Sequence, residues 1–386
     1  MEKWIKSIKG TIPHTNKTVD IELDGKNLIV TGGNGSGKTS FLKSLYLIDL
    51  ALLRERGEII QRLIKSNIIE PNSFTIKNIE NNQENFAVDF VDEELFKNLY
   101  DGKKAVLKFY EEKRLSEIKQ PKIGQQVNAD DNKLGNELEQ HLVNLKTRAS
   151  LAITEDKDQA LADKINAWMI DFEKNLKILF EDSALKLSFK YYEVDKTGFE
   201  IIQNDKPPFT FQTLSAGYRA IFDIYADLLM HTEYFKIMPN ELTGVVLIDE
   251  IDSHLHVSLQ RLILPFFTQS FPKIQFIVTT HSPFVLMSTP DAVVFDLAKN
   301  EAITEDLSYY TYSAVMKGLW NVKPISAHLE NTIKEIAKIV NSEQKDYKQL
   351  EELVEATKPY ENALDSESKV FLMLGIEALE EGDKNV

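Results

Sequence analysis

The stretch TGGNGSGKTS, residues 31–40, follows the apolar run NLIV and precedes a segment whose apolar residues recur at helical spacing. It contains the pattern G-x-x-x-x-G-K-T, whose glycines let backbone N–H groups close around phosphate oxygens at a helix N-terminus. A strand before the pattern and a helix after it are the context in which it is typical of a triphosphate site. The stretch therefore predicts an α/β fold built around a phosphate-binding loop.

Each residue type in this loop has an expected role. Lys38 is expected to bridge the β- and γ-phosphates, and Thr39 to ligate Mg²⁺ through its hydroxyl. ATP and Mg²⁺ are thus the expected cofactors. The residues expected to bind the nucleotide are Gly32, Asn34, Gly35, Ser36, Gly37, Lys38, Thr39 and Ser40.

Two later strands are predicted to end in polar side chains at the edge where open parallel sheets place ligands. VVLIDE, residues 245–250, ends in Asp249, an expected Mg²⁺ ligand, and Glu250, expected to orient and polarise the attacking water. IQFIVTT ends at His281, which can hydrogen-bond the γ-phosphate. The simpler alternatives are a buried strand that ends in solvated acids and a histidine that faces solvent. Beside the phosphate-binding loop, the catalytic interpretation of Glu250 and His281 is favoured.

The octapeptide TLSAGYRA, residues 213–220, precedes another predicted helix and contains the pattern L-S-x-G. On its own this pattern most often marks a serine that caps a helix. The order of phosphate loop, L-S-x-G, apolar strand with D-E, a further Asp and then His resembles the ATP-binding-cassette class of P-loop ATPases, in particular SMC, RecN and RecF-like heads. The resemblance implies that Ser215 and Gly217 contact the γ-phosphate bound by a partner subunit. ATP would then join two heads into a homodimer or a higher homo-oligomer.

The sequence EIDSHLH continues from the acidic strand end. By the same resemblance, Asp252 matches the D-loop that passes along the dimer interface. The DSHLH portion is similar to a bacterial subgroup of stand-alone ATPases, and a metal pair formed by His254 and His256 is the less favoured alternative.

Arg219 is expected to be a structural ion-pair partner. Gln83 is the nearest candidate for the glutamine loop of this class, and its assignment stays open.

The resemblance implies an α/β fold of the ABC-type P-loop ATPase head, with a mixed β-sheet, flanking helices, a helical insertion and a helical C-terminus. It covers about residues 1–90 and 185–325. The expected divisions are a first head lobe with the P-loop over 1–92, a mainly helical insertion over 93–184, a second head lobe over 185–325 and an acidic helical region over 326–386.

Composition restricts the environment and the partners. The net charge is −15, with 60 acidic and 45 basic residues, so a nucleic-acid partner, which is left open, needs a local basic patch. Residues 97–114 are the richest candidate for such a patch, although a solvated face is the favoured interpretation. The chain has no cysteine and no apolar run long enough for a membrane span, so a cytoplasmic protein without a membrane partner is expected.

The stretches that carry a closer resemblance are HLVNLKTRASLA and DKINAWMIDFEKNLKILFED in the insertion, and LSFKYY and PPFTFQTLSAGYRAIFDI in the second lobe. They look most like the ATPases of bacterial anti-phage systems such as Septu, PARIS and retron modules. The favoured hypothesis is a slow ATPase that dimerises through ATP and scaffolds or restrains a separate effector, a nuclease or Toprim-like protein. No nuclease activity is expected in this chain, because the sequence after His281 lacks the D-x-D of the OLD-type relatives. The alternative is a RecF-like ATPase that clamps DNA. A transporter motor and a small-molecule kinase fit the motifs less well.

Overall fold

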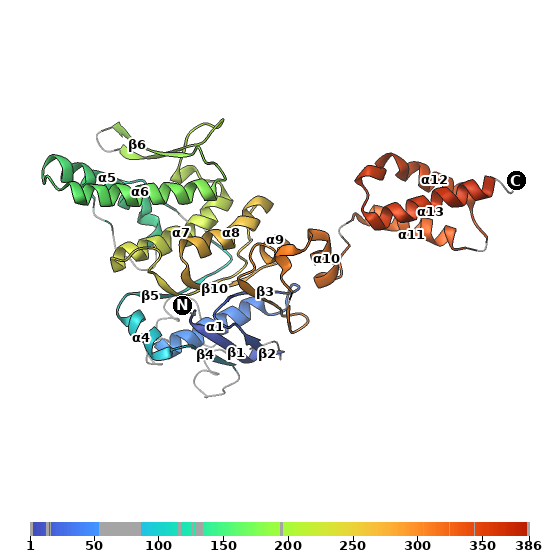
Figure 1. The fold of residues 1–386 in the computed structure, drawn as a ribbon, viewed down its shortest axis with the longest axis horizontal. Helices are drawn as coiled ribbons and strands as arrows, with labels where there is room; N and C mark the ends of the chain where they lie inside the picture. The colour runs from blue at the N-terminus through green and yellow to red at the C-terminus, as the bar shows by residue number, and fades with distance from the viewer. Residues whose placement is uncertain are drawn as a thin grey trace. The chain divides into compact units, whose positions relative to one another are not determined.

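The computed structural model describes residues 3–12, 15, 17–53, 86–114, 117–122, 124–125, 127, 134–193, 196–303, 305–323, 325–342 and 344–383. The chain divides into two compact units, Met1–Tyr310 and Thr311–Val386 (Figure 1). Among the described residues, the larger unit contains three sheets and the smaller unit contains helices only. This arrangement confirms the expected mixed α/β class with a helical C-terminus.

A six-stranded sheet forms the centre of the larger unit. Its order is β12 (Glu301–Ile303), β11 (Ala292–Asp296), β3 (Asn27–Thr31), β10 (Lys273–Thr279), β9 (Thr243–Ile248) and β5 (Ala105–Tyr110). All neighbouring pairs are parallel except β11 and β12. The apolar runs NLIVT and TGVVLI are buried almost throughout, as expected for parallel strands covered on both faces.

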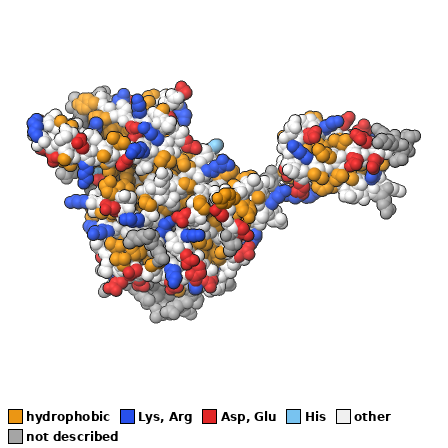
Figure 2. All heavy atoms as spheres, viewed as in Figure 1, with side chains coloured by type: hydrophobic (Ala, Val, Ile, Leu, Met, Phe, Trp, Pro, Cys, Tyr) orange, Lys and Arg blue, Asp and Glu red, His pale blue; other side chains and the backbone are white. Residues whose placement is uncertain are grey.

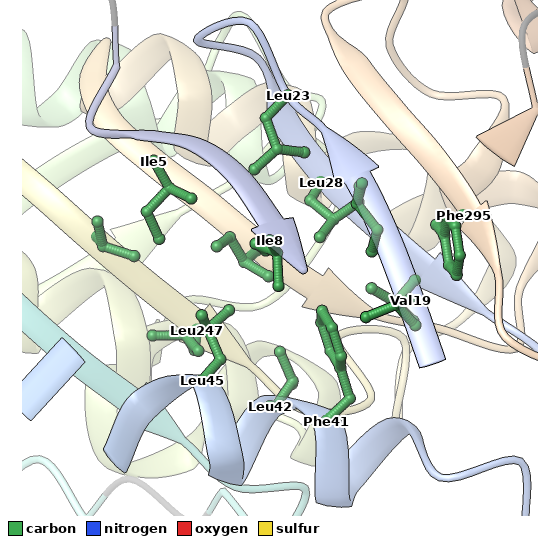
Figure 3. Close-up of a cluster of buried hydrophobic side chains, with 14 of the residues drawn as sticks. Ile5, Ile8, Val19, Leu23, Leu28, Phe41, Leu42, Leu45, Leu247 and Phe295 are labelled. Carbon is green, nitrogen blue, oxygen red and sulfur yellow. The ribbon is translucent and has the colours of Figure 1, made fainter. Parts of the chain in front are cut away.

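One face of this sheet is covered by α1 (Lys38–Leu53) and by an antiparallel sheet of β2 (Lys17–Glu22), β1 (Ile5–Ile12) and β4 (Phe86–Phe90). Figure 3 shows how Phe41, Leu42 and Leu45 of α1 point toward Leu247 of β9 and side chains of β1 and β2. Gln275 of β10 is fully buried and bonds the N–H and the C=O of Ile5. The core therefore fixes the position of the helix that follows the phosphate-binding loop.

The opposite face carries α7 (Ala216–Phe235) and α8 (Val257–Ser270), and beyond them lie α5 (Leu138–Thr154) and α6 (Gln159–Leu179) (Figure 1). A small antiparallel sheet of β6 (Lys186–Glu193), β7 (Lys196–Ile202) and β8 (Phe209–Thr210) packs against α5. The remaining described elements of this unit are short. They are α4 (Glu93–Asp101), α9 (Pro283–Leu286) and the 3₁₀ turns η1 (Leu134–Glu137), η2 (Phe211–Thr213) and η3 (Leu307–Tyr309).

The smaller unit consists of α10 (Tyr312–Trp320), α11 (Ala327–Val340), α12 (Tyr347–Thr357), the 3₁₀ turn η4 (Lys358–Ala363) and α13 (Ser366–Asp383). Three of its helices share a core that includes Ile336, Leu350 and Leu372. Ser326, Asp346 and Thr311 cap the starts of α11, α12 and α10 with side-chain hydrogen bonds. No described helix of the chain is both long enough and apolar enough to cross a membrane.

The region 93–184, expected to be mainly helical, contributes the edge strand β5 to the central sheet. Its sequence AVLKFY is a short run of apolar and aromatic residues, a typical strand sequence, and charged neighbours hid this signal. The domain divisions themselves stay predictions. Gln83, the glutamine-loop candidate, lies outside the described residues.

The basic residues of 97–114 do not form one patch. Lys108 of β5 forms an ion pair with Asp227, its Nζ lying 3.4 Å from the carboxylate. Arg114 is buried, whereas Lys103, Lys104 and Lys113 are exposed. On the face of the larger unit seen in Figure 2, Lys and Arg side chains are interspersed with Asp and Glu. The interpretation of residues 97–114 as a solvated face therefore holds for only part of this stretch.

Gly244 in β9 provides a test of the sheet. Its φ of +142° is rare for residues with a side chain, and a Cβ at this position would lie 2.0 Å from the carbonyl oxygen of Val106 in β5. We expect Gly244→Ala to lower the free energy of unfolding by about 2–4 kcal/mol, because the backbone of β5 or β9 must shift. Denaturant unfolding measures this. Gly318→Ala, where a Cβ meets nothing within 4 Å, is the control. Equal stability of the two variants would contradict the strand pairing.

Candidate functional site

The strand order brings three distant segments of the sequence to one edge of the central sheet. The neighbours β3, β10 and β9 are parallel, so their carboxyl ends lie side by side. The phosphate-binding loop follows β3, His281 follows β10, and Asp249 with Glu250 follows β9. The predicted nucleotide-binding and catalytic residues therefore meet at the position where such sheets bind ligands.

The loop between β3 and α1 has the backbone that its glycines allow. Gly35 and Gly37 have φ values of +74° and +100°, in the left-handed region. Lys38 is 6% exposed, and its ammonium donates to the carbonyl oxygens of Gly32 at 3.0 Å and Gly33 at 3.3 Å. Burial lowers the pKa of Lys38, and the carboxylates of Glu250 and Asp249 act in the opposite direction. The loop thus holds one cation at the start of α1.

A chain of hydroxyl and carboxylate groups connects the three strand ends. The hydroxyl of Thr39 donates to one oxygen of Asp249 at 2.8 Å, and the hydroxyl of Thr279 donates to the other at 2.6 Å. Thr279 also accepts from the N–H of Glu250 at 2.7 Å. The hydroxyl of Thr39 and the carboxylate of Asp249 are the oxygen donors that Mg²⁺ prefers, so this pair fits the expected ion. The buried hydroxyl of Ser36, without a hydrogen-bond partner among the described residues, offers a further polar atom inside the loop.

Glu250 has an unusual backbone for a residue with a side chain. Its φ is +45°, a left-handed conformation that costs roughly 1–2 kcal/mol in an L-residue. Its carbonyl oxygen accepts from the Nη2 of Arg114 at 2.5 Å. Strain of this kind is retained where neighbouring contacts impose it, and such positions are concentrated at functional sites.

The side chains of Glu250 and His281 face each other, with 4.0 Å between Oε1 and Nε2. Burial raises the pKa of Glu250, and the nearby carboxylates of Glu112 and Asp249 act in the same direction. Burial and the charge of Lys38 lower the pKa of His281. The imidazole is therefore neutral near pH 7 and able to accept a hydrogen bond as well as donate one.

The octapeptide lies at the start of α7. Ser215 occupies the N-cap position, but its side chain makes no capping hydrogen bond within the described residues and is exposed to solvent. Gly217 is buried beside the carbonyl oxygen of His254. The commonest meaning of the pattern, a serine side chain that caps its helix, is therefore not what the structure has.

The residues around the predicted D-loop have separate roles. The hydroxyl of Thr280 donates to the carboxylate of Asp252, which links this loop to the end of β10. His256 caps α8 by accepting from the N–H of Ser258 at 3.4 Å. Within the described ranges, no group of three or more side chains suited to a metal is found. The ion pair expected for Arg219 is not found among these residues either, and its Nε is buried without a partner there.

Sequence patterns did not assign Thr279, Thr280, Glu112 or Arg114 to this site, and Arg114 was noted only as part of the basic stretch 97–114. The two threonines directly precede His281, and that adjacency is the signal available for them. Glu112 and Arg114 follow β5, a strand whose place next to β9 is set by the fold. Their proximity to Glu250 therefore could not be inferred from motif spacing.

A second acidic pair lies behind this site on α7. Asp223 and Asp227 are four residues apart, and Asp227 accepts from the hydroxyl of Tyr110 at 2.6 Å. Burial and the repulsion of Asp227 raise the pKa of Asp223 to about 6, while the charge of Arg114 acts against this shift. The middle of α7 thus carries one carboxyl group that titrates near neutral pH.

A known protein family matches most of this structure. The family described as "AAA domain, putative AbiEii toxin, Type IV TA system" matches residues 28–288. The matched range includes the phosphate-binding loop, the octapeptide, the acidic end of β9 and His281.

Two curated relatives share parts of the sequence. The Retron Ec83 probable ATPase of Escherichia coli is 33% identical over 133 residues, which cover 33% of this chain and 24% of that protein. The Septu protein PtuA of Bacillus mycoides (strain KBAB4) is 34% identical over 134 residues, or 33% of this chain and 17% of that protein. The chain thus matches a quarter or less of the length of these relatives.

Similar solved structures include an Smc head bound to the C-winged helix domain of ScpA. This likeness has a TM-score of 0.41 at 14% identity and covers 78% of this chain and 96% of that one. The cbiO1 protein of Clostridium perfringens, part of the transporter complex cbiONQ, has a TM-score of 0.35 at 12% identity, with coverages of 87% and 95%.

The raised pKa of Asp223 gives a prediction for stability. Its folded-state pKa of about 6 exceeds the ordinary value of 3.8, so its contribution to stability is present below about pH 4 and is lost as the pH rises to 6. Asp223→Asn cannot ionise. We expect the free energy of unfolding of this variant, minus that of the wild type, to increase by about 1–3 kcal/mol between pH 4 and pH 7.

Denaturant unfolding at a series of pH values measures this difference. Asp163→Asn, at an exposed position of α6, is the matched control. If the difference in the free energy of unfolding between Asp223→Asn and the wild type stayed constant across this pH range, the raised pKa of Asp223 would be contradicted.

Proposed function

Since the chain belongs to the AAA-domain family described above, we propose that it binds ATP with Mg²⁺ and hydrolyses it at the edge of the central sheet. The observation that carries this proposal is the continuous contact from Thr39 through Asp249 and Thr279 to Glu250. It joins a metal-binding hydroxyl of the phosphate loop to the residue suited to orient water. A bound Mg²⁺ would neutralise charge on the phosphates.

The residues of the site divide the work of phosphoryl transfer to water. Lys38 and the N–H groups of the loop hold the β- and γ-phosphates. Thr39 and Asp249 would supply oxygen ligands to Mg²⁺. Glu250 accepts a hydrogen bond from the attacking water and so orients it toward the γ-phosphate. His281, neutral near pH 7, donates a hydrogen bond to the γ-phosphate or holds the same water.

We propose further that each site is completed by a second copy of the chain. Ser215 supports this because its hydroxyl is exposed at the start of a helix and is not used to cap that helix. The N-terminus of a helix attracts phosphate through its free N–H groups and its dipole. Ser215 and Gly217 would then contact the γ-phosphate bound by the partner, with Asp252 at the interface.

An effector-regulating role in anti-phage defence is the biological part of the proposal. The relatives named as a retron ATPase and a Septu protein support it through sequence similarity. The C-terminal unit offers a surface for a separate effector, a nuclease or Toprim-like protein. Figure 2 shows hydrophobic side chains gathered on the visible face of this unit among acidic ones. Its exposed residues include Glu351, Glu352, Glu355, Val370, Met373, Leu374, Glu380 and Glu381.

The alternative, an ATPase that clamps DNA, receives less support. Such a clamp needs a continuous basic channel for the phosphates of the duplex. The stretch 97–114 was the richest candidate, but Lys108 is paired with Asp227 and Arg114 is buried.

Two substitutions separate nucleotide binding from hydrolysis. Lys38→Ala removes the cation that faces the phosphates, so we expect the affinity for ATP to fall by about 10- to 100-fold. Glu250→Gln keeps this cation and removes the carboxylate that orients water, so we expect ATP binding to persist and hydrolysis to fall by about 100-fold or more. Calorimetry and phosphate release measure the two effects.

Light scattering of Glu250→Gln with and without ATP measures assembly, and a dimer is expected only with ATP. Lys43→Ala, at a half-buried position on α1 where the ammonium pairs with Glu111, is the control for the loss of a lysine. Monomers under both conditions would count against the proposed dimer.

Mixing two inactive variants tests whether the site is shared. Lys38→Ala disables the phosphate loop and Ser215→Arg blocks the helix tip, so each variant alone is expected to be inactive. If sites form between chains, a mixed dimer contains one intact site. Equal mixing should then restore about a quarter of the wild-type rate, since half of the dimers are mixed and each has one of two sites intact. The control mixes the wild type with Lys38→Ala/Ser215→Arg. No recovery on mixing would indicate sites built within one chain.

A further inference from the structure

Glu250 is fixed by hydrogen bonds at both sides of its backbone. Its N–H donates to the hydroxyl of Thr279 at 2.7 Å, and its carbonyl oxygen accepts from the N–H of Ser253 at 2.9 Å and from Nη2 of Arg114 at 2.5 Å. The bond to Ser253 is a local turn contact three residues along the chain. Of the two contacts to the carbonyl oxygen, the one from Arg114 comes from another part of the fold, 136 residues away along the chain.

Arg114 is placed for this contact by the end of β5. It follows that strand by four residues and is 3% exposed. Burial lowers the pKa of Arg114, and the carboxylates of Asp223, Asp252, Asp249 and Glu112 counteract the shift, in that order. A guanidinium stays charged under such conditions, so a cation is held beside the backbone of Glu250.

The contact matters because the backbone of Glu250 is strained. A residue at a φ of +45° turns toward the ordinary negative region when its neighbours permit. Such a rotation would redirect the side chain, whose Oε1 now lies 4.0 Å from Nε2 of His281. A donor on the carbonyl oxygen opposes the rotation, because the oxygen would have to leave a buried, charge-assisted hydrogen bond.

We propose that Arg114 is a positioning residue for hydrolysis: its guanidinium holds the carbonyl of Glu250 and thereby keeps the carboxylate directed at the attacking water. The proposal rests on the ATPase function proposed above. Arg114 does not touch the reacting atoms, and its effect is confined to the step that Glu250 serves. The binding of ATP depends on Lys38 and the phosphate-binding loop, whereas the hydrogen bonds of Arg114 go to the carbonyl oxygens of Glu250 and Glu112.

Steady-state kinetics of Arg114→Gln and Arg114→Lys test this role. For Arg114→Gln we expect kcat to fall by about 10- to 100-fold, with the KM for ATP within about twofold of the wild type, because misdirection of a catalytic group affects the chemical step. Arg114→Lys keeps a cation with a donor and is expected to retain an intermediate kcat. Lys113→Gln changes the exposed neighbouring cation and should behave as the wild type.

A double-mutant cycle with Glu250→Gln separates positioning from general damage. If Arg114 acts through the carboxylate, Arg114→Gln should lower the residual single-turnover rate of Glu250→Gln by less than about twofold. An equal relative loss in both backgrounds, or a rise in KM with kcat preserved, would overturn the proposal. Should Arg114→Gln not fold, Arg114→Lys decides, since a wild-type kcat for that variant would also overturn it.

The same measurements distinguish this proposal from the function beneath it. A wild-type protein that binds ATP and does not hydrolyse it would overturn the proposed ATPase and the role of Arg114 together. A wild-type rate that survives Arg114→Gln would overturn the role of Arg114 alone.

Discussion

The site depends on the order of three parallel strands. Because β10 lies between β3 and β9, a single hydroxyl, that of Thr279, can contact both Asp249 and Glu250 while Thr39 reaches Asp249 from the other side. The order is maintained by buried polar contacts as well as by apolar packing. Gln275 joins β10 to Ile5, and Asn27 at the start of β3 accepts from the N–H of Phe276. A change in strand register would separate all of these groups together.

Charge is the second constraint at this edge. Asp249, Glu250 and Asp252 lie near one another, and their mutual repulsion favours a bound cation. Lys38 supplies one positive charge in the loop, and Arg114 supplies another behind Glu250. Neither cation replaces the ion expected between Thr39 and Asp249, whose donors are all oxygens. The arrangement therefore suits a ligand that brings both metal charge and phosphate charge, as Mg²⁺ with ATP does.

The sequence predicts the residues whose role is local and leaves out those whose role depends on strand order. Lys38, Thr39, Asp249, Glu250 and His281 all follow recognisable strands, so their common edge could be inferred. Arg114 and Glu112 could not be found in this way, because β5 gave a weak strand signal and its pairing with β9 is a tertiary property. The conformation of Ser215 was also unpredictable. Whether a serine at an N-cap position uses its hydroxyl for capping depends on a rotamer that the pattern does not specify.

The fold also connects α7 with the site of the proposed hydrolysis. Tyr110, the last residue of β5, accepts from the N–H of Asp249 through its carbonyl oxygen at 2.9 Å. Its hydroxyl donates to Asp227 of α7, and burial raises the pKa of this hydroxyl, so it remains a donor near neutral pH. One residue thus joins the acidic strand end to the helix whose tip carries Ser215. If the proposed dimer forms, a shift of α7 on engaging a second nucleotide would be transmitted to β5 and to the segment that places Arg114 against Glu250. The proposed assembly and the proposed orientation of water would then share one mechanical connection.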